Sequence, residues 1–241
     1  MNLKLPRNEL HVWHIELPNQ AQNTKQNIHL LDSFEKIRLN NFSHPFMRQN
    51  YLLIRITLRN ILGKYLKSPP AQVSINTNSY NKPQLCPLKG QVNLQFNISH
   101  CANSAVIAFA LDASVGIDLE LRNKKRNIKA LLRRYFSPQT TAEIDALPQA
   151  ERHEAFLRVW TKFEAYKKAM GTGLRGGDPA IYIPHLLPSA EQFQLLFPGD
   201  TQQNHWLVSE VNSEPGTLIS VVVDKRLRPR AIKHFSAKIP V

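Results

Sequence analysis

The chain has 241 residues, 42% of them hydrophobic and 20% charged, which excludes a fully disordered protein and allows a sizeable core. With only 9 glycines and 16 prolines, a collagen-like or low-complexity protein is also excluded. Lysine and arginine number 31 against 18 acids, giving a net charge of +13. This charge predicts an anionic partner: nucleic acid, an anionic membrane, a phosphate-rich ligand or an acidic protein.

The first half of the chain is predicted to contain a strand, a long helix and several further strands. A weak alternation predicts a strand at residues 11–17, and apolar residues three and four apart predict a helix over 34–66. Ser68-Pro69-Pro70 ends that helix. We expect a short strand at 73–75, a turn at 79–83, and strands at 94–98, 105–110 and 115–119.

The second half begins with helices and closes with a predicted antiparallel sheet. Helices are expected at 128–136, at 141–146 and at 151–170, with Gly171 as the C-terminal cap of the last. Apolar runs at 193–197, 206–211 and 218–223 predict the strands, and the basic tail from Lys225 is expected to be peripheral. This order favours an α+β fold over a regular parallel sheet. A boundary near residue 113 would divide the chain into halves 1–113 and 114–241.

The sequence predicts a cytoplasmic protein. It contains no run of 18 apolar residues, and its N-terminus lacks the apolar core of a secretory signal. Cys86 and Cys101 have no CxxC partner, so we expect two free thiols in a reducing compartment. No membrane association is expected.

Two carboxylates lie close together in Gly116-Ile117-Asp118-Leu119-Glu120. Their i, i+2 spacing on a strand places both on one face. Adjacent carboxylates repel unless a cation or proton lies between them, and Mg²⁺ prefers such oxygen ligands. From this fragment alone, two solvated acids at a strand edge are the more common arrangement.

Two other fragments carry polar groups of interest. In the helix over 151–170, an apolar stripe is predicted to be buried and contains Phe156, Val159, Trp160, Phe163 and Tyr166. Glu164 flanks this stripe, and Lys168 can lie back over Glu164 from one turn later. Alone, this would be a surface ion pair worth about 0.3–0.5 kcal/mol. At 97–100, a predicted strand ends with Ser99 and His100, whose side chains and neighbouring backbone N–H groups can bind phosphate. A lone Ser-His pair is more often structural.

Taken together and in this order, the fragments resemble the 4′-phosphopantetheinyl transferases of the large monomeric type. That family shows a Gly-Lys/Arg-Pro turn, a hydrophobic-Asn-hydrophobic-Ser-His strand end, a Gly-hydrophobic-Asp-hydrophobic-Glu strand and a Trp-x-x-Lys-Glu-Ala/Ser-x-x-Lys helix. The corresponding segments here are Asn81-Lys82-Pro83 and residues 96–100, 116–120 and 160–168. The resemblance covers roughly residues 10 to 224.

The resemblance implies two similar subdomains related by a pseudo-twofold axis, with the active site in the cleft between them. It implies a monomeric enzyme that uses Mg²⁺ to move the 4′-phosphopantetheine arm of coenzyme A onto a serine hydroxyl. The acceptor would be an apo acyl or peptidyl carrier protein, and the product left behind would be 3′,5′-adenosine bisphosphate. Coenzyme A is polyanionic and carrier proteins are typically acidic, which would account for the positive charge.

The resemblance also implies roles for individual residues. Mg²⁺ would be held by Asp118, Glu120 and Glu164, with Glu164 also the candidate base and Lys168 the catalytic cation. Coenzyme A would be bound by Arg48, Lys82, Pro83, Ser99, His100, Asp118 and Lys168. Carrier-protein docking is expected on a short amphipathic helix, through Arg133, Arg134, Tyr135 and Phe136.

The sequence departs from the family pattern at two positions. Phe163 stands where the family has lysine, and the neighbouring Lys162 lies about 100° further around the helix. The slot of a family arginine in the first long helix falls on Asn50, so Arg48 is chosen as the nearest basic residue. Gly171, Gly173, Gly176 and Gly177 are interpreted as a helix cap and turn rather than as a phosphate loop.

Two other classes of protein remain open from the residues alone. A Mg²⁺-dependent nuclease would also use clustered carboxylates, a lysine and a basic surface. An RNA-binding protein would use the positive charge but leaves the three acids without a purpose, because acids weaken phosphate binding. Interleaved aromatic residues that would stack bases are not evident, so we favour the transferase and expect no nucleic-acid partner.

Overall fold

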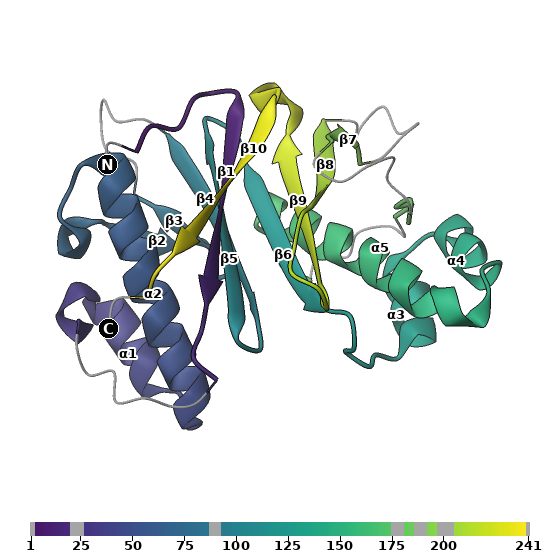
Figure 1. Ribbon diagram of the computed structural model, residues 1–241, viewed down its shortest axis with the longest axis horizontal. Helices are drawn as coiled ribbons and strands as arrows, with labels where there is room; N and C mark the ends of the chain where they lie inside the picture. Colours follow the sequence, from purple (N-terminus) through teal and green to yellow (C-terminus); the bar gives the residue numbers. More distant parts are fainter. Residues whose placement is uncertain are drawn as a thin grey trace.

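A computed structural model describes residues 3–19, 27–86, 93–174, 181–185, 192–196 and 205–239. Two four-stranded sheets stand in the middle of the molecule, with helices on both outer sides (Figure 1). Gly176, Gly177 and residue 197, named above, lie outside the described residues. The mixture of helices and largely antiparallel sheets confirms the predicted α+β class.

The first sheet has the order β10-β1-β5-β4. Its strands are β1 (Glu9–Glu16), β4 (Leu94–Cys101), β5 (Ser104–Leu111) and β10 (Ala231–Ala237). β1 runs antiparallel to β5 and parallel to β10. The expectation that the tail from Lys225 is peripheral is therefore wrong. The tail returns to the first sheet as β10, where Phe235 stacks on Trp13 with ring centroids 4.7 Å apart.

The second sheet has the order β6-β9-β8-β7 and is antiparallel throughout. Its strands are β6 (Val115–Leu121), β7 (Gln194–Leu195), β8 (Trp206–Val211) and β9 (Thr217–Asp224). A separate hairpin pairs β2 (Ile75–Thr77) with β3 (Pro83–Leu85). The predicted closing strands thus form, and β9 pairs with β6, which comes from the middle of the chain and lies at one edge of this sheet.

Each sheet carries one 22-residue helix on its outer face, α2 (Pro45–Leu66) on the first and α5 (Gln149–Met170) on the second. The shorter helices are α1 (Ser33–Asn40), α3 (Ile128–Tyr135) and α4 (Pro138–Asp145), with single 3-10 turns at Ile28–Leu30, Pro70–Gln72 and Lys225–Leu227. The halves are therefore built alike, as two similar subdomains require. Within the described residues, no helix combines the length and apolar character needed to cross a membrane.

The helix expected over 34–66 is divided in two. α1 begins at a capping box, in which Asp32 and Glu35 each accept the other's backbone N–H. α2 begins anew at Pro45, a residue that suits the first turn of a helix because that turn needs no N–H partner.

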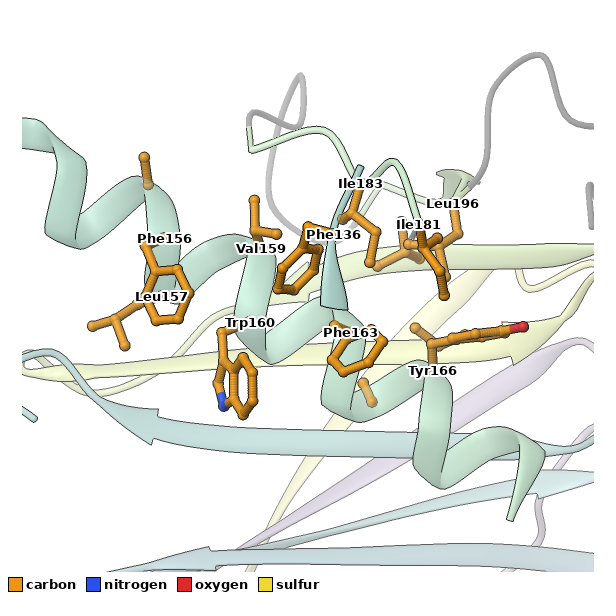
Figure 2. Close-up of a cluster of buried hydrophobic side chains, with 14 of the residues drawn as sticks. Phe136, Phe156, Leu157, Val159, Trp160, Phe163, Tyr166, Ile181, Ile183 and Leu196 are labelled. Atoms are coloured by element: carbon orange, nitrogen blue, oxygen red, sulfur yellow. The ribbon is translucent and has the colours of Figure 1, made fainter. Parts of the chain in front are cut away.

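Apolar side chains form separate cores on the two faces of each sheet. α2 packs on the first sheet through Leu58 and Leu62, with Phe109 opposite. α5 packs on the second through the cluster in Figure 2, which includes Trp160 and Phe163. A third cluster lies between the sheets and contains Val106, Ile117, Leu119 and Val221. β6 is therefore buried on both faces, and polar groups on it are removed from water.

Candidate active site

Asp118 and Glu120 lie on the face of β6 that is turned to α5. Their neighbours Ile117 and Leu119 pack on the opposite face, between the sheets. Gly116 shares the α5 face, and a Cβ there would lie 2.0 Å from the backbone oxygen of Ala165. The helix therefore runs directly over this strand because Gly116 has no side chain. The contact brings Glu164 and Lys168 of α5 to the carboxylates of β6.

Asp118 is 2% exposed and its two oxygens differ. Oδ1 accepts hydrogen bonds from Lys168 Nζ at 2.6 Å and from Ser99 Oγ at 3.0 Å. Oδ2 is buried and has no hydrogen-bond partner. A buried carboxylate oxygen without a partner is costly, so Asp118 is suited to a ligand that supplies positive charge.

Glu164 lies among like charges. Burial first, and then the neighbouring Asp118 and Glu120 carboxylates, raise the pKa of its carboxyl to about 7, although the charges of Lys168 and Arg126 oppose the rise. From the sequence, Lys168 is expected to lie over Glu164, but its amine forms its ion pair with Asp118. Glu164 is thus free to take up a proton near neutral pH or to accept a cation.

Glu120 is 4% exposed and is held by two basic side chains. Lys124 Nζ lies 3.0 Å from Oε2, and the Arg126 guanidinium pairs with Oε1. Arg126 also lies over the Trp160 ring, 4.9 Å from its centroid. The sequence alone favours a solvated basic face at Lys124-Lys125-Arg126, and this interpretation is wrong for Arg126, whose side chain is largely buried against Glu120 and Trp160.

Among the residues described, no three His, Cys, Asp or Glu side chains meet in a group that could hold a metal ion. The chemistry of the donors nevertheless fits a hard divalent cation, since Asp118 Oδ2 has no hydrogen-bond partner and the pKa of Glu164 is raised by burial and by the neighbouring carboxylates. Glu120 would first have to release one of its two basic partners.

The end of β4 joins the two sheets beside these carboxylates. Ser99 Oγ accepts the Leu119 N–H at 3.1 Å and a bond from Lys168 Nζ at 2.9 Å, besides donating to Asp118. Asn97 Oδ1 accepts the Ile117 N–H at 2.9 Å. Asn97 was quoted in the motif without a role, and the structure shows it connecting β4 to β6.

His100 follows Ser99 at the exposed end of β4. Partial burial of the ring and the charge of Lys168 lower the pKa of His100. Nearby, Asn50 Nδ2 donates to the carbonyl of Ala102 in the β4–β5 turn, at 3.3 Å. Asn50 therefore reaches the turn that follows His100, whereas Arg48 is exposed and donates to Asn40 Oδ1 at 3.2 Å.

Lys82 and Pro83 belong to the N-terminal half but lie in different surroundings. Lys82 Nζ donates to the carbonyls of Val115 and Ala169, at 3.3 and 3.2 Å, so its amine contacts β6 and α5. Pro83 begins β3 and lines a small pocket beside α1 and α2, together with Arg38, Tyr51 and Arg55. The lining of that pocket does not include Asp118, Glu120 or Glu164.

The structure corrects the expected docking surface at one residue. Arg133 and Arg134 are exposed on α3, and Tyr135 is half-buried. Phe136 is 2% exposed and packs against Phe163 with ring centroids 5.1 Å apart, so it is a core residue and contacts no partner. It follows the end of α3, where the chain turns inward.

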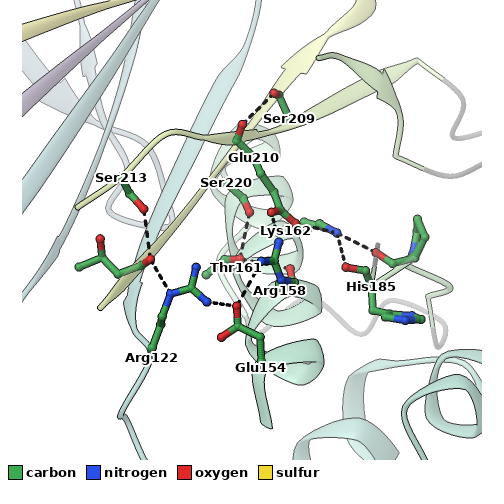
Figure 3. Close-up of polar contacts among 12 residues, drawn as sticks. Arg122, Glu154, Arg158, Thr161, Lys162, His185, Ser209, Glu210, Ser213 and Ser220 are labelled. Atoms are coloured by element: carbon green, nitrogen blue, oxygen red, sulfur yellow. Dashed lines mark hydrogen bonds and ion pairs between the residues drawn. The ribbon is translucent and has the colours of Figure 1, made fainter. Parts of the chain in front are cut away.

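Positions 162 and 163 of α5 serve packing rather than the carboxylate site. Phe163 joins the aromatic cluster in Figure 2, as its place in the apolar stripe predicts. Lys162 is fully buried, and its amine contacts the carbonyls of Pro184 and His185 and the carboxylate of Glu210 (Figure 3). The charge of Lys162 thus lies within the second half and does not replace a lysine at 163.

Two carboxylates on a strand and a third with a lysine on the facing helix can support cation-assisted group transfer to or from a phosphate. Comparison with known proteins identifies one family over both halves of the chain. Residues 114–222 match the family model of the 4′-phosphopantetheinyl transferase superfamily, and residues 17–111 match that of the 4′-phosphopantetheinyl transferase N-terminal region.

Individual relatives agree with these matches. The chain is 35% identical over 173 residues to the 4′-phosphopantetheinyl transferase HetI of Nostoc sp., covering 72% of this chain and 73% of HetI. It is 30% identical over 180 residues to slr0495 of Synechocystis sp., covering 75% and 71% of the two chains. Sfp of Bacillus subtilis is 22% identical over 161 residues, covering 67% and 69%. The chain therefore belongs to the 4′-phosphopantetheinyl transferase superfamily and is an enzyme of phosphopantetheinyl transfer.

Proposed function

We propose that this enzyme moves the 4′-phosphopantetheine arm of coenzyme A to a serine hydroxyl of an apo acyl or peptidyl carrier protein and releases 3′,5′-adenosine bisphosphate. The observation that carries the proposal is the pairing of Asp118, which has one buried oxygen without a partner, with Glu164, whose pKa is raised to about 7. Asp118 can bind a cation, and Glu164 can accept a proton.

Asp118, Glu120 and Glu164 would hold Mg²⁺. When bound, the cation would neutralise negative charge on the pyrophosphate and on the departing nucleotide. Asp118 is kept in one orientation by Ser99 and Lys168. That orientation leaves Oδ2 as the oxygen available to a ligand.

Glu164 is proposed to accept the proton of the carrier serine, directly or through water. A base works best when its pKa lies near the working pH, and the raised pKa of Glu164 meets this condition. Lys168 carries positive charge to the same place and would stabilise the charge that builds up on the phosphate during transfer.

The remaining proposed contacts concern the two substrates. His100, exposed at the end of β4, is proposed to contact the 3′-phosphate of coenzyme A, with the net charge of +13 of the chain steering the polyanion. Arg133 and Arg134, exposed on α3, are proposed to contact an acidic carrier protein. Both substrates are expected in the cytoplasm, and we propose that the enzyme acts there as a monomer.

One assay tests the proposal. The purified enzyme is incubated with coenzyme A, Mg²⁺ and an apo carrier protein, and intact-mass spectrometry measures the carrier. We expect the carrier to gain the mass of the arm, with 3′,5′-adenosine bisphosphate appearing in equal amount. A carrier whose acceptor serine is changed to alanine is the control. Absence of the mass gain across several carrier proteins would refute the proposed activity.

A further inference from the structure

A turn of the N-terminal half lies against the C-terminal end of α5. In this turn Asn78 Oδ1 accepts the backbone N–H groups of Tyr80 and Lys82, both at 2.9 Å. The Asn78 Nδ2 group donates across the halves to the carbonyl of Gly171, at 2.8 Å. One asparagine side chain therefore both shapes the turn and attaches it to the residue that ends α5.

Lys82 makes the second attachment. Its amine donates to the carbonyls of Ala169 in the last turn of α5 and of Val115 at the start of β6. Burial lowers the pKa of this amine to about 8. The last carbonyls of a helix have no partner within the helix, and a basic group there is favourable. Lys82 thus joins helix and strand at one point.

Gly171 is shaped to receive this turn. It caps α5 in the left-handed conformation, with φ 74°, which glycine adopts without strain. A Cβ at this position would lie 2.9 Å from Asn78 Nδ2 and 3.3 Å from Lys82 Cδ. The glycine therefore serves close approach as well as backbone conformation.

The geometry points to Asn78 and Lys82 as positioning residues that hold the end of α5 against β6 and so place Glu164 and Lys168 opposite Asp118. Glu164 and Lys168 lie within the last two turns of α5, next to the attached end. Phe163 and Tyr166 pack these two helical turns into the core of the second sheet, whereas the contact over Gly116, the bond from Lys168 to Asp118 and the attached turn set their position along β6. A frayed helix end would separate the candidate base from the strand.

This role differs from direct binding of coenzyme A by Lys82, and kinetics separate the two. A phosphate ligand acts mainly on KM for coenzyme A, whereas a group that positions the base and the cation acts mainly on kcat. Only the kinetic part of this inference rests on the proposed function, because kcat and KM can be measured only if the enzyme catalyses the proposed transfer. Helix order can be measured without any substrate.

The experiment compares three variants of the full chain. Asn78→Asp keeps the acceptor oxygen for the turn but replaces the donor that faces Gly171, and Lys82→Met keeps the length of the side chain but removes the amine. Lys36→Met, at an exposed lysine of α1, is the control for loss of a charge. Hydrogen exchange of the amides at 164–171 and steady-state kinetics are measured for each.

We expect exchange at 164–171 to rise about tenfold or more in Asn78→Asp and Lys82→Met, and to stay unchanged in Lys36→Met. We expect kcat to fall about tenfold or more in the first two variants, with KM for coenzyme A within about twofold of the wild type. Unchanged exchange would overturn the inference, as would a Lys82→Met enzyme with full kcat and a strongly raised KM for coenzyme A.

The two proposals fail in different ways. If the wild-type enzyme transfers no arm, the proposed function is wrong and the exchange measurement alone decides the role of the turn. If Lys82→Met does not fold, Asn78→Asp decides it, because that change alters one hydrogen bond and leaves the turn's own bonds in place.

Discussion

The amine of Lys168 on α5 lies 2.6 Å from Oδ1 of Asp118 on β6, so the ion pair joins two elements rather than two turns of one helix. Lys168 is less than one-third exposed and Asp118 is buried, so the pair is shielded from much of the surrounding water. The electrostatic attraction between two shielded charges is stronger than that between two charges at the surface of one helix, because less water lies between them. The pair also fixes which oxygen of Asp118 stays available.

Removing the negative charge of Asp118 should abolish most of the activity. We expect Asp118→Asn to lower kcat by about 100-fold or more and to weaken Mg²⁺ activation, because the variant loses the negative charge of a buried carboxylate whose Oδ2 has no hydrogen-bond partner. Asp112→Asn, at a loop carboxylate paired with Arg7, is the control. The measurement is kcat over a Mg²⁺ titration. Full activity of Asp118→Asn in EDTA would contradict the metal role.

The two lysines of α5 should separate activity from stability. Lys168→Ala should lower kcat while the protein stays folded, because its charge lies at the carboxylate site. Lys162→Ala should lower the free energy of unfolding by about 1–3 kcal/mol, because it leaves the carbonyls of Pro184 and His185 without their donor. Urea denaturation and kcat are measured for both. Equal kcat losses would show that Lys162 also serves the site.

Stability without metal should depend on pH through Glu164. Its pKa is raised from 4.5 to about 7, so the folded state binds a proton that the unfolded state has lost between these values. The stabilisation is full below pH 4.5 and is lost as pH rises through about 7. In EDTA, Glu164→Gln should therefore melt higher than the wild type at pH 8, with the difference shrinking as pH falls. A constant difference across pH would contradict the raised pKa.

Gly116→Ala should disrupt the contact between helix and strand. The new Cβ would lie 2.0 Å from the Ala165 oxygen and 2.4 Å from the Ala169 nitrogen, both backbone atoms that move only with the helix. We expect kcat to fall about tenfold or more and Tm to drop. Gly173→Ala is the control, since its space is open and only its left-handed backbone costs about 1–2 kcal/mol. A Gly116→Ala enzyme with wild-type kcat would show that the helix position is not critical.

Reversing Arg133 and Arg134 to glutamate should affect one substrate only. We expect KM for the carrier protein to rise about tenfold or more, because exposed charges on α3 steer and hold an acidic partner. KM for coenzyme A should stay close to the wild-type value. The wild-type KM for the carrier should also rise with salt, because salt screens exposed charges. A matching rise in both KM values would place α3 at the coenzyme A site instead.

Local patterns in the sequence were sufficient for most elements and for the family. The alternation in β6 predicted one face for Asp118 and Glu120, and the apolar stripe of α5 predicted a buried Phe163, because both periods are properties of a single element. The motif order was specific enough to identify the superfamily. The division of the first long helix was missed, because the apolar periodicity continues across the break before Pro45.

Contacts between distant segments were decided only by the tertiary structure. Three contacts join residues more than forty positions apart: the pairing of β10 with β1, the hydrogen bond from Asn78 to Gly171, and the hydrogen bond from Lys168 to Asp118. No local period encodes such a contact, since it depends on how two sheets and two helices pack. The sequence by itself therefore determined which groups the site contains, and packing over Gly116 decided which of them meet.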